Sequence, residues 1–124
     1  MANELILIVE DNPQNLKLVR DTLQVKGYQT IETETGEEGV RLAHERRPAL
    51  ILMDIQLPGI NGVEALRQLP ADPVTSTIPV IAVTASVMTD DRTRIMAAGF
   101  DGCQGKPISV KQLLVTVREI LDKP

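Results

Sequence analysis

The chain has 124 residues, 43% of them hydrophobic and 24% charged, which is enough for one domain with a buried core and too little for two comfortable ones. Its 17 acidic residues outnumber the 13 basic ones, which argues against nucleic-acid binding because that role requires clustered lysine and arginine. The single cysteine excludes an intrachain disulfide, and the sequence shows neither a secretory leader nor an apolar run near the roughly 20 residues of a membrane span. We therefore expect one domain over residues 1–124, located in the cytoplasm, with no nucleic-acid or membrane partner.

The first third of the sequence predicts two strands separated by an amphipathic helix. Residues 4–9 are apolar on both faces, as expected of a central parallel strand. Asn12 and Pro13 then supply an N-cap and a first helical residue, and Gly27 ends the helix. Residues 28–33 alternate in polarity, which is typical of a half-exposed edge strand. The inward-facing stripe of the helix is predicted to comprise Leu18, Val19, Thr22 and Leu23.

The middle of the chain predicts a helix followed by a buried strand. Thr35 and Glu38 fit a capping box, in which a hydroxyl and a carboxylate satisfy free amides at the start of a helix over about 36–46. The apolar residues 50–53 predict a strand that delivers Asp54 to a Pro-Gly loop. The elements that follow are a short helix at about 61–69 and a polar loop at 70–77.

The last third predicts two more strand and helix pairs. A strand at 78–83 precedes a helix at 88–98 with Gly99 as a left-handed C-cap, and a short strand at 102–105 precedes a helix that starts at Ser109. The inward stripe of this last helix is predicted to be Val110, Leu113, Leu114, Val117, Ile120 and Leu121. Five strand and helix units with right-handed crossovers predict an α/β fold, a doubly wound parallel sheet with helices on both faces.

Polar side chains follow four of the predicted strands. Glu10 and Asp11 follow the first strand, Asp54 the third, Thr84 the fourth and Lys106 the fifth. Ligands of open α/β sheets bind in the crevice beyond the carboxyl ends of the strands, so we expect these five groups to meet there.

Converging acids repel one another unless a cation compensates them, and hard oxygen ligands favour Mg²⁺, with Mn²⁺ as an alternative. We predict Asp11 and Asp54 as direct ligands, Glu10 as a ligand through water, and the backbone carbonyl of Gln56 as a further ligand. Taken without the other acid, the pair at 10 and 11 would instead indicate a solvated turn or the acidic first residues of a helix.

A carboxylate beside a magnesium ion can attack a phosphoryl group and form an aspartyl phosphate, and Asp54 is the candidate nucleophile. Such chemistry needs positioned cations and donors around the transferred group. Lys106 would supply a positive charge, Thr84 a hydroxyl, and the small Ala85 access to backbone amides. Taken singly, Thr84 would indicate a helix cap and Lys106 a surface lysine.

These residues resemble the receiver domains of two-component response regulators over the whole chain, and most closely the single-domain kind related to chemotaxis and cell-division regulators. The resemblance rests on the acids at 10, 11 and 54, on Thr84-Ala85 and Lys106-Pro107, and on the loop 54–62. It implies a flavodoxin-like sheet of order 2-1-3-4-5 with five helices and a cis peptide before Pro107.

For function, the resemblance implies a phosphoprotein of a phosphorelay. It would accept a phosphoryl group on Asp54 from a sensor histidine kinase or a phosphotransfer protein, catalyse only its own phosphorylation and dephosphorylation, and signal by docking to a downstream protein that the sequence does not name. We expect a monomer or a weak homodimer. The kinase-facing residues are predicted to be Gln14, Leu16, Arg20 and Ile108, with Leu16 equally compatible with the core.

The chain departs from the family at position 103. The family usually carries an aromatic switch residue three positions before the lysine, where this chain has Cys103. We therefore expect a shift of Thr84 to be transmitted through residues 85–90 and the fourth helix, or through the first helix. Cys103 itself is predicted to be a small, partly buried hydrophobe rather than a redox sensor, and His44 a surface residue.

Two other functions compete with the signalling switch. A magnesium phosphatase with an aspartate nucleophile normally has a second acid two residues later, where Gln56 stands, and it also needs a cap for substrate selection. A pseudo-receiver that acts as a constitutive interaction module would not need the acids, the threonine and the lysine together.

Overall fold

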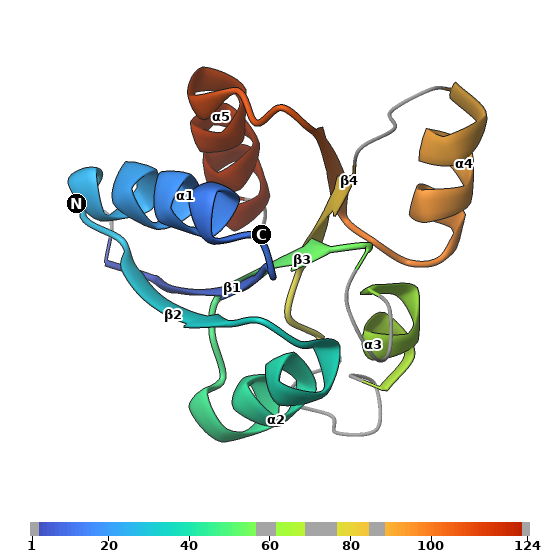
Figure 1. Ribbon diagram of the computed structural model, residues 1–124, viewed down its shortest axis with the longest axis horizontal. Coiled ribbons are helices and arrows are strands. Elements are labelled where there is room, and N and C mark those ends of the chain that lie inside the picture. Colours follow the sequence, from blue (N-terminus) through green and yellow to red (C-terminus); the bar gives the residue numbers. More distant parts are fainter. Residues whose placement is uncertain (1–2, 57–61, 69–76, 85–88, 123–124) are drawn as a thin grey trace.

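The computed structural model describes residues 3–56, 62–68, 77–84 and 89–122, and it has the predicted α/β architecture (Figure 1). The strands form a single parallel sheet in the order β2-β1-β3-β4-β5, as predicted. Five helices connect or follow the strands in the described part of the chain. The elements are β1 (Leu5–Val9), α1 (Pro13–Val25), β2 (Gln29–Thr33), α2 (Gly36–Arg46), β3 (Leu50–Asp54), α3 (Gly62–Gln68), β4 (Val80–Thr84), α4 (Thr89–Ala97), β5 (Gly102–Gly105) and α5 (Val110–Leu121).

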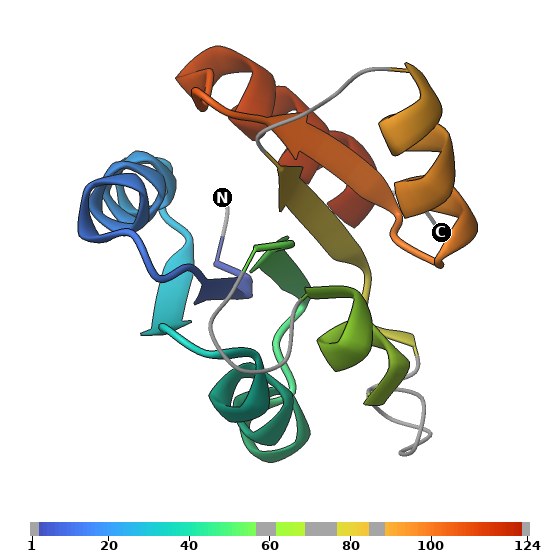
Figure 2. The same ribbon diagram turned by 45° about the vertical axis from the view of Figure 1, so that its right-hand side comes forward.

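Helices cover both faces of the sheet, so the core has two layers (Figures 1 and 2). On one face, alternate strand residues such as Leu7 and Met53 pack with α2, α3 and α4. On the other face, Ile8 and Leu52 pack with α1 and α5. Residues that alternate along a strand point to opposite faces, and both sets are buried here. The near-continuous apolar runs of β1, β3 and β4 follow from this two-sided cover.

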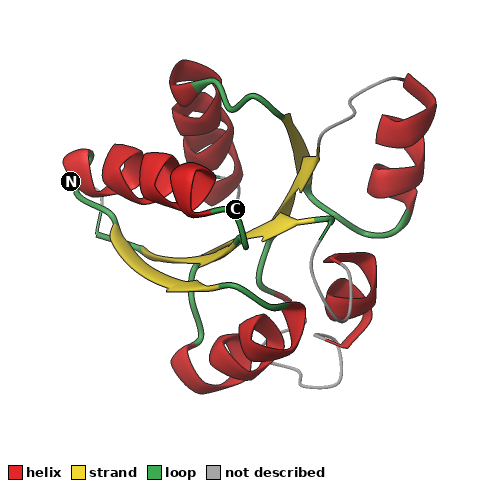
Figure 3. Ribbon diagram, in the orientation of Figure 1, coloured by secondary structure: helices red, strands yellow, loops and turns green. Residues whose placement is uncertain are grey.

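The predicted caps lie where loops meet helices, and Figure 3 distinguishes these two kinds of segment by colour. The Asn12 side chain accepts hydrogen bonds from the amides of Gln14 and Asn15, at 3.0 and 3.1 Å, and Ser109 caps α5 in the same manner. Gly99 has a φ of 113°, as its predicted role as a left-handed C-cap requires. These caps fix where α1 and α5 begin, and both starts lie beside the carboxyl edge of the sheet.

The capping box at the start of α2 is only half formed. Thr35 accepts a hydrogen bond from the Glu38 amide at 3.2 Å, but the Glu38 carboxylate pairs with Arg41 rather than returning to the helix start. α2 ends at Arg46, as predicted, but the sequence did not predict that the next residue, Arg47, adopts the left-handed conformation with a φ of 48°. A non-glycine residue at such a position has no clear sequence signal.

Two expectations about packing, those for Leu18 and Val110, were wrong. Leu18 is 39% exposed rather than buried, because Leu16, Val19 and Leu23 form the face of α1 that meets the sheet. Val110 is 40% exposed because it faces a shallow groove shared with α1 instead of the sheet. His44, expected at the surface, is half-buried in α2.

The strand boundaries also differ slightly from the prediction. β4 begins at Val80 and includes Thr84, and Tyr28 precedes β2 as a buried residue instead of opening it. The Tyr28 hydroxyl accepts a hydrogen bond from Arg118 at 3.2 Å, and the same guanidinium pairs with Glu4 at 3.0 Å, which fastens α5 to the start of the sheet. In the described part of the chain, no helix is long and apolar enough to cross a membrane.

Candidate functional site

The carboxyl edge of the sheet brings together charged residues from three strand ends. Glu10 directly follows β1, Asp54 is the last residue of β3, and Lys106 follows β5. Asp54 is 1% exposed and Glu10 is 3% exposed, and they are the only buried acids among the residues whose burial the structure describes. Burial of a charged group is costly unless it is paired, which makes this edge the candidate site.

Asp54 is held by two hydrogen bonds, one to each carboxylate oxygen. Its Oδ1 accepts from the backbone amide of Gln56 at 3.0 Å, and its Oδ2 accepts from the Nζ of Lys106 at 2.8 Å. The first bond exists because the chain turns sharply after β3 and brings the next amides back toward the carboxylate. The second bond spans 52 residues and depends on the adjacency of the strands.

Lys106 is positioned by the backbone of β4. Its amide donates to the carbonyl of Thr84 at 2.9 Å, and the following peptide bond to Pro107 is cis, as the family resemblance implied. From there its Nζ lies 2.8 Å from Asp54 and 3.6 Å from Glu10. Burial lowers the pKa of Lys106, but its hydrogen bond to Asp54 and the charges of Glu10 and Asp54 outweigh this effect and raise the pKa. The ammonium therefore stays charged.

Glu10 has an unusual protonation equilibrium. Burial, followed by the proximity of the Asp54 carboxylate, raises its pKa to about 7, although the Asn12 amide, 3.1 Å from its Oε2, and the Lys106 charge act in the opposite direction. The single positive charge of Lys106 thus neutralises only part of the negative charge of the two buried carboxylates. A site of this kind has residual negative charge that a further cation would neutralise.

The acids are close enough to share such a cation. Glu10, Asp11 and Asp54 each offer a carboxylate oxygen, and these oxygens lie within 4.8 Å of one another. Asp11 is exposed and opens the cluster to solvent, while the other two are buried. Hard oxygen donors beside solvent suit Mg²⁺ or Mn²⁺, which usually retain several waters. The residues present therefore fit a hard divalent cation.

The remaining predicted site residues lie beside this cluster or outside the described chain. Gln56 is exposed, and its backbone adjoins Asp54 through the hydrogen bond described above. Thr84 is 7% exposed at the end of β4, the strand next to β3. Ala85, most of the 54–62 loop and residues 85–88 lie outside the described residues.

The predicted docking residues divide into two groups. Gln14 is exposed on α1, and Arg20 is half-exposed there, where its guanidinium lies 3.3 Å from Glu32 and 3.4 Å from Asp21. Leu16 and Ile108 are partly buried and pack against the core beneath α1 and α5. The core alternative considered for Leu16 thus has structural support, and Arg20 is already engaged by acids of its own chain.

Cys103 is half-buried in β5 and packs against the apolar layer under α4. Burial raises the pKa of its thiol, although the charge of Arg92 acts in the opposite direction. A protonated thiol is a poor nucleophile, so the environment is that of a small hydrophobe and not of a reactive cysteine. The sequence interpretation of Cys103 as a partly buried hydrophobe is confirmed.

The sequence did not predict that the side chain of Gln104 is buried. It is 5% exposed, and its buried Oε1 accepts no hydrogen bond from any residue in the described ranges. A polar residue between small neighbours in a short strand gives no signal of burial. The structure reveals it because α5 covers this side of β5.

Fold and site together define a flavodoxin-like α/β domain with an acid and lysine cluster at the carboxyl edge of its sheet. The sequence also matches the profile described as the response regulator receiver domain over residues 6–118. The chain therefore belongs to the response regulator receiver domain family.

Relatives with similar sequences and structures agree with this assignment. The polar-differentiation response regulator DivK of Brucella anthropi is 47% identical over 116 residues, which cover 94% of each chain. The receiver domain of sensor histidine kinase PA1611 from Pseudomonas aeruginosa is 32% identical, with a TM-score of 0.90 over 98% of this chain and all of that one, and its structure contains a magnesium ion in the active-site cleft. The chemotaxis response regulator CheY4 of Vibrio cholerae shares the fold, with a TM-score of 0.90 at 24% identity over 96% of this chain and 99% of that one.

Proposed function

We propose that residues 1–124 act as a stand-alone response regulator that accepts a phosphoryl group on Asp54 in a magnesium-dependent reaction. The donor would be a sensor histidine kinase or a phosphotransfer protein, and the phosphorylated form would dock onto a downstream protein until it dephosphorylates itself. The observation that carries the proposal is the buried Asp54 carboxylate, hydrogen-bonded to Lys106 at 2.8 Å within a cluster of acids. The match to DivK over 94% of its own length supports the stand-alone form.

In the proposed reaction, a carboxylate oxygen of Asp54 forms a bond to phosphorus while the bond from phosphorus to the donor histidine nitrogen breaks. The electron pair of that bond leaves with the imidazole. Lys106, already 2.8 Å from Oδ2, would exchange its carboxylate partner for an oxygen of the transferred group. Fixed donors of this kind stabilise charge that is spread over equatorial oxygens.

The metal would be held by Asp11 and Asp54, by Glu10 through water, and by the backbone carbonyl of Gln56. A bound magnesium ion supplies positive charge that offsets the repulsion between the carboxylates and an incoming phosphoryl group. The bound cation would change the protonation of Glu10 most. Without a metal the pKa of this residue is about 7, which is consistent with a site that lacks one positive charge.

Phosphorylation would be sensed by Thr84, whose hydroxyl would donate to a phosphate oxygen with support from the Ala85 amide. Because Cys103 carries no ring, we propose that the shift of Thr84 is transmitted through the start of α4, or alternatively through α1. The kinase would contact the exposed Gln14 and the half-exposed Arg20, with Leu16 and Ile108 at the margin of that surface.

The test is incubation with Mg²⁺ and acetyl phosphate, followed by intact-mass spectrometry. We expect one phosphoryl group per chain and none in Asp54→Asn, while the matched control Asp21→Asn, an exposed acid on α1, remains labelled. Steady release of phosphate from p-nitrophenyl phosphate would favour the phosphatase alternative. Absence of any labelling, with acetyl phosphate or with a phosphorylated kinase, would favour the pseudo-receiver.

A further inference from the structure

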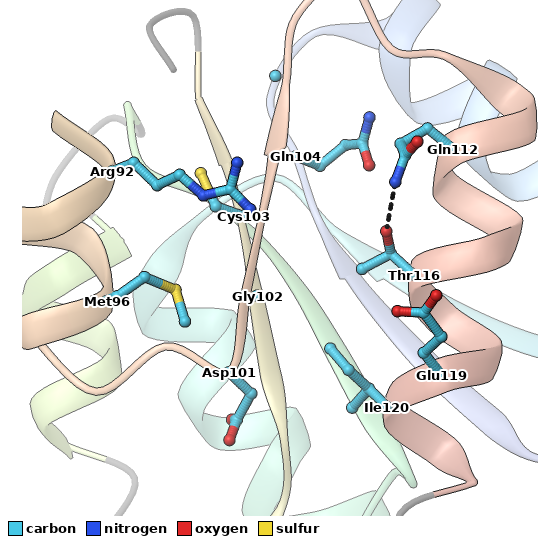
Figure 4. Close-up of a pocket in the computed structure, with 11 residues that line it drawn as sticks. Arg92, Met96, Asp101, Gly102, Cys103, Gln104, Gln112, Thr116, Glu119 and Ile120 are labelled. Atoms are coloured by element: carbon cyan, nitrogen blue, oxygen red, sulfur yellow. Dashed lines mark hydrogen bonds between the residues drawn. The ribbon is translucent and has the colours of Figure 1, made fainter. Parts of the chain in front are cut away.

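A shallow groove of ≈ 310 Å³ lies between α1 and α5, two helices that pack side by side (Figure 1). Val25 of α1 and both Val110 and Leu114 of α5 form its apolar part. The opposite side of α5, which carries Gln112 and Glu119, lines a separate groove along β5 (Figure 4). The first groove therefore belongs to α1 and to the near side of α5 alone.

Val25 is the most exposed large hydrophobic residue in the described part of the chain. It is 83% exposed, Val110 across the groove is 40% exposed, and Leu114 is partly buried. Leu18 lies about two helical turns before Val25 and extends the same apolar surface along α1. A single exposed valine is ordinary, but several apolar side chains around one groove form a patch that another apolar surface can cover.

The face of α1 that lines the groove also carries one acid and one base. These are Asp21 and Lys26, five positions apart. Lys26 is exposed and forms no ion pair with another described residue. The groove therefore has a cation available at one end of its α1 side and a carboxylate at the other.

Asp21 can accept a further donor although it already has partners. Lys17 lies 2.7 Å from one of its oxygens and Arg20 lies 3.4 Å from the other, and Arg20 also pairs with Glu32. The Asp21 side chain nevertheless remains 46% exposed. A carboxylate has about four acceptor positions, so a third cation can approach from solvent.

This pattern is complementary to itself when two copies of α1 pack antiparallel. Around a twofold axis, residue i of one copy faces residue j of the other, and j faces i. With the axis at the midpoint of residues 21–26, Asp21 of one copy faces Lys26 of the other, and Thr22 faces Val25. Each contact occurs twice. An unrelated partner would need to match the acid, the base and the valine independently, whereas a second copy supplies all three by symmetry.

We propose that this face is a contact between two copies of the chain, in which Val25 of each copy enters the groove of the other and Asp21 of each copy pairs with Lys26 of the other. The valines supply affinity, and the charged pairs fix the register. One helix pair and a shallow groove give a small interface, so the dimer is weak and transient. The inference goes beyond the function proposed above, because it requires neither magnesium nor phosphorylation of Asp54.

The first experiment measures self-association of the full, unphosphorylated chain in metal-free buffer. Sedimentation equilibrium with interference optics suits a chain with one tyrosine and no tryptophan. We expect a monomer–dimer equilibrium with a Kd below about 1 mM, the lower limit of useful affinity. Val25→Ser should weaken it about tenfold, because two valine side chains lose their apolar cover. The matched control is Val115→Ser, a valine that is 44% exposed on α5 outside this groove, and it should leave the equilibrium unchanged.

The second experiment reverses the charges. Asp21→Lys places cations opposite each other in the homodimer, and Lys26→Glu places acids opposite each other, so each variant should dimerise about tenfold more weakly than the parent chain. A mixture of the two variants restores unlike charges at both contacts. Their heterodimer should therefore form with the parental affinity, which fluorescence energy transfer between labelled chains measures. A folding defect in either variant cannot produce this recovery.

Four results would overturn the proposal. The first is a monomer at every concentration up to about 1 mM. The second is an equal effect of Val25→Ser and Val115→Ser, and the third is a mixture of the charge variants that associates no better than either variant alone. The fourth is association that survives Val25→Ser but is lost in Glu119→Lys, which would place the contact in the groove along β5.

Discussion

The charges at the carboxyl edge of the sheet and those on the outer face of α2 are arranged in opposite ways. At the sheet edge, Asp54 and Glu10 are buried and share one lysine that comes from a distant strand. On α2, Arg41 pairs with Glu38 and with Glu45, all of them solvated neighbours on one helix. Removal of a buried partner leaves a charge without hydration, whereas removal of an exposed one leaves it in water. The fold therefore depends on the first group and hardly on the second.

The largest effect should come from Lys106→Met. This variant removes the only cation beside Asp54 and Glu10 among the described residues, and we expect a loss of about 3 kcal/mol in the free energy of unfolding without metal. Labelling by acetyl phosphate should slow by about 100-fold, as is typical when one donor to a transition state is removed. Urea denaturation and mass spectrometry measure the two effects. Lys111→Met is the matched control, and an equal loss there would contradict the comparison.

The packing beneath the site provides the next test. A Cβ at Gly39 would lie 2.8 Å from Cγ2 of Val9, the residue that precedes Glu10. Gly39→Ala should therefore cost about 1–3 kcal/mol, despite the higher helix propensity of alanine. Thermal denaturation would measure it, with the exposed Glu37→Ala on the same helix as control. A stabilised Gly39→Ala would show that β1 can move away from α2 without loss.

The protonation of Glu10 should make stability depend on pH. Its folded pKa of about 7 lies above the ordinary value of 4.5, so the native state binds this proton more tightly than the unfolded state does. The contribution of Glu10 to stability should therefore fall as pH rises from about 4.5 to 7, by about 2–3 kcal/mol. Urea titrations at several pH values should show a flatter profile for Glu10→Gln than for the parent. Mg²⁺ should also flatten it, because a cation favours the ionised carboxylate.

The smallest effect should come from Arg41→Met. Its two ion pairs lie on the solvated face of α2, so we expect no measurable change in the denaturation midpoint or in the labelling rate. A loss comparable to that of Lys106→Met would remove the distinction between the two groups of charges.

The sequence predicted the fold and the convergence of Glu10, Asp11, Asp54 and Lys106, because both depend on strong local signals. Apolar runs that end on Glu10, Asp54 and Thr84 identify the strands and their carboxyl ends at once. Parallel pairing then brings those ends together, so the cluster could be predicted from the strand order without further knowledge of long-range contacts. The cap at Asn12 and the C-cap at Gly99 have the same local character.

The errors concern features that depend on how helices rotate against the sheet. Leu18 and Val110 satisfy the helical period but point away from the sheet, because the buried stripe of each helix is narrower than its apolar stripe. Gln104 is buried by α5 although nothing in its neighbourhood predicts it. Such contacts depend on the position of a neighbouring helix, which a periodic pattern does not contain.

The distribution of the two aromatic residues has a practical consequence for spectroscopy. Tyr28 packs in the layer under α1 and α5, and Phe100 packs in the layer under α2, α3 and α4, each almost fully buried. Because the chain has no tryptophan, tyrosine emission originates from one side of the sheet alone. A tryptophan in place of Phe100 would add a second fluorophore on the other side, and stopped-flow records of the two signals would show whether both layers consolidate at the same rate.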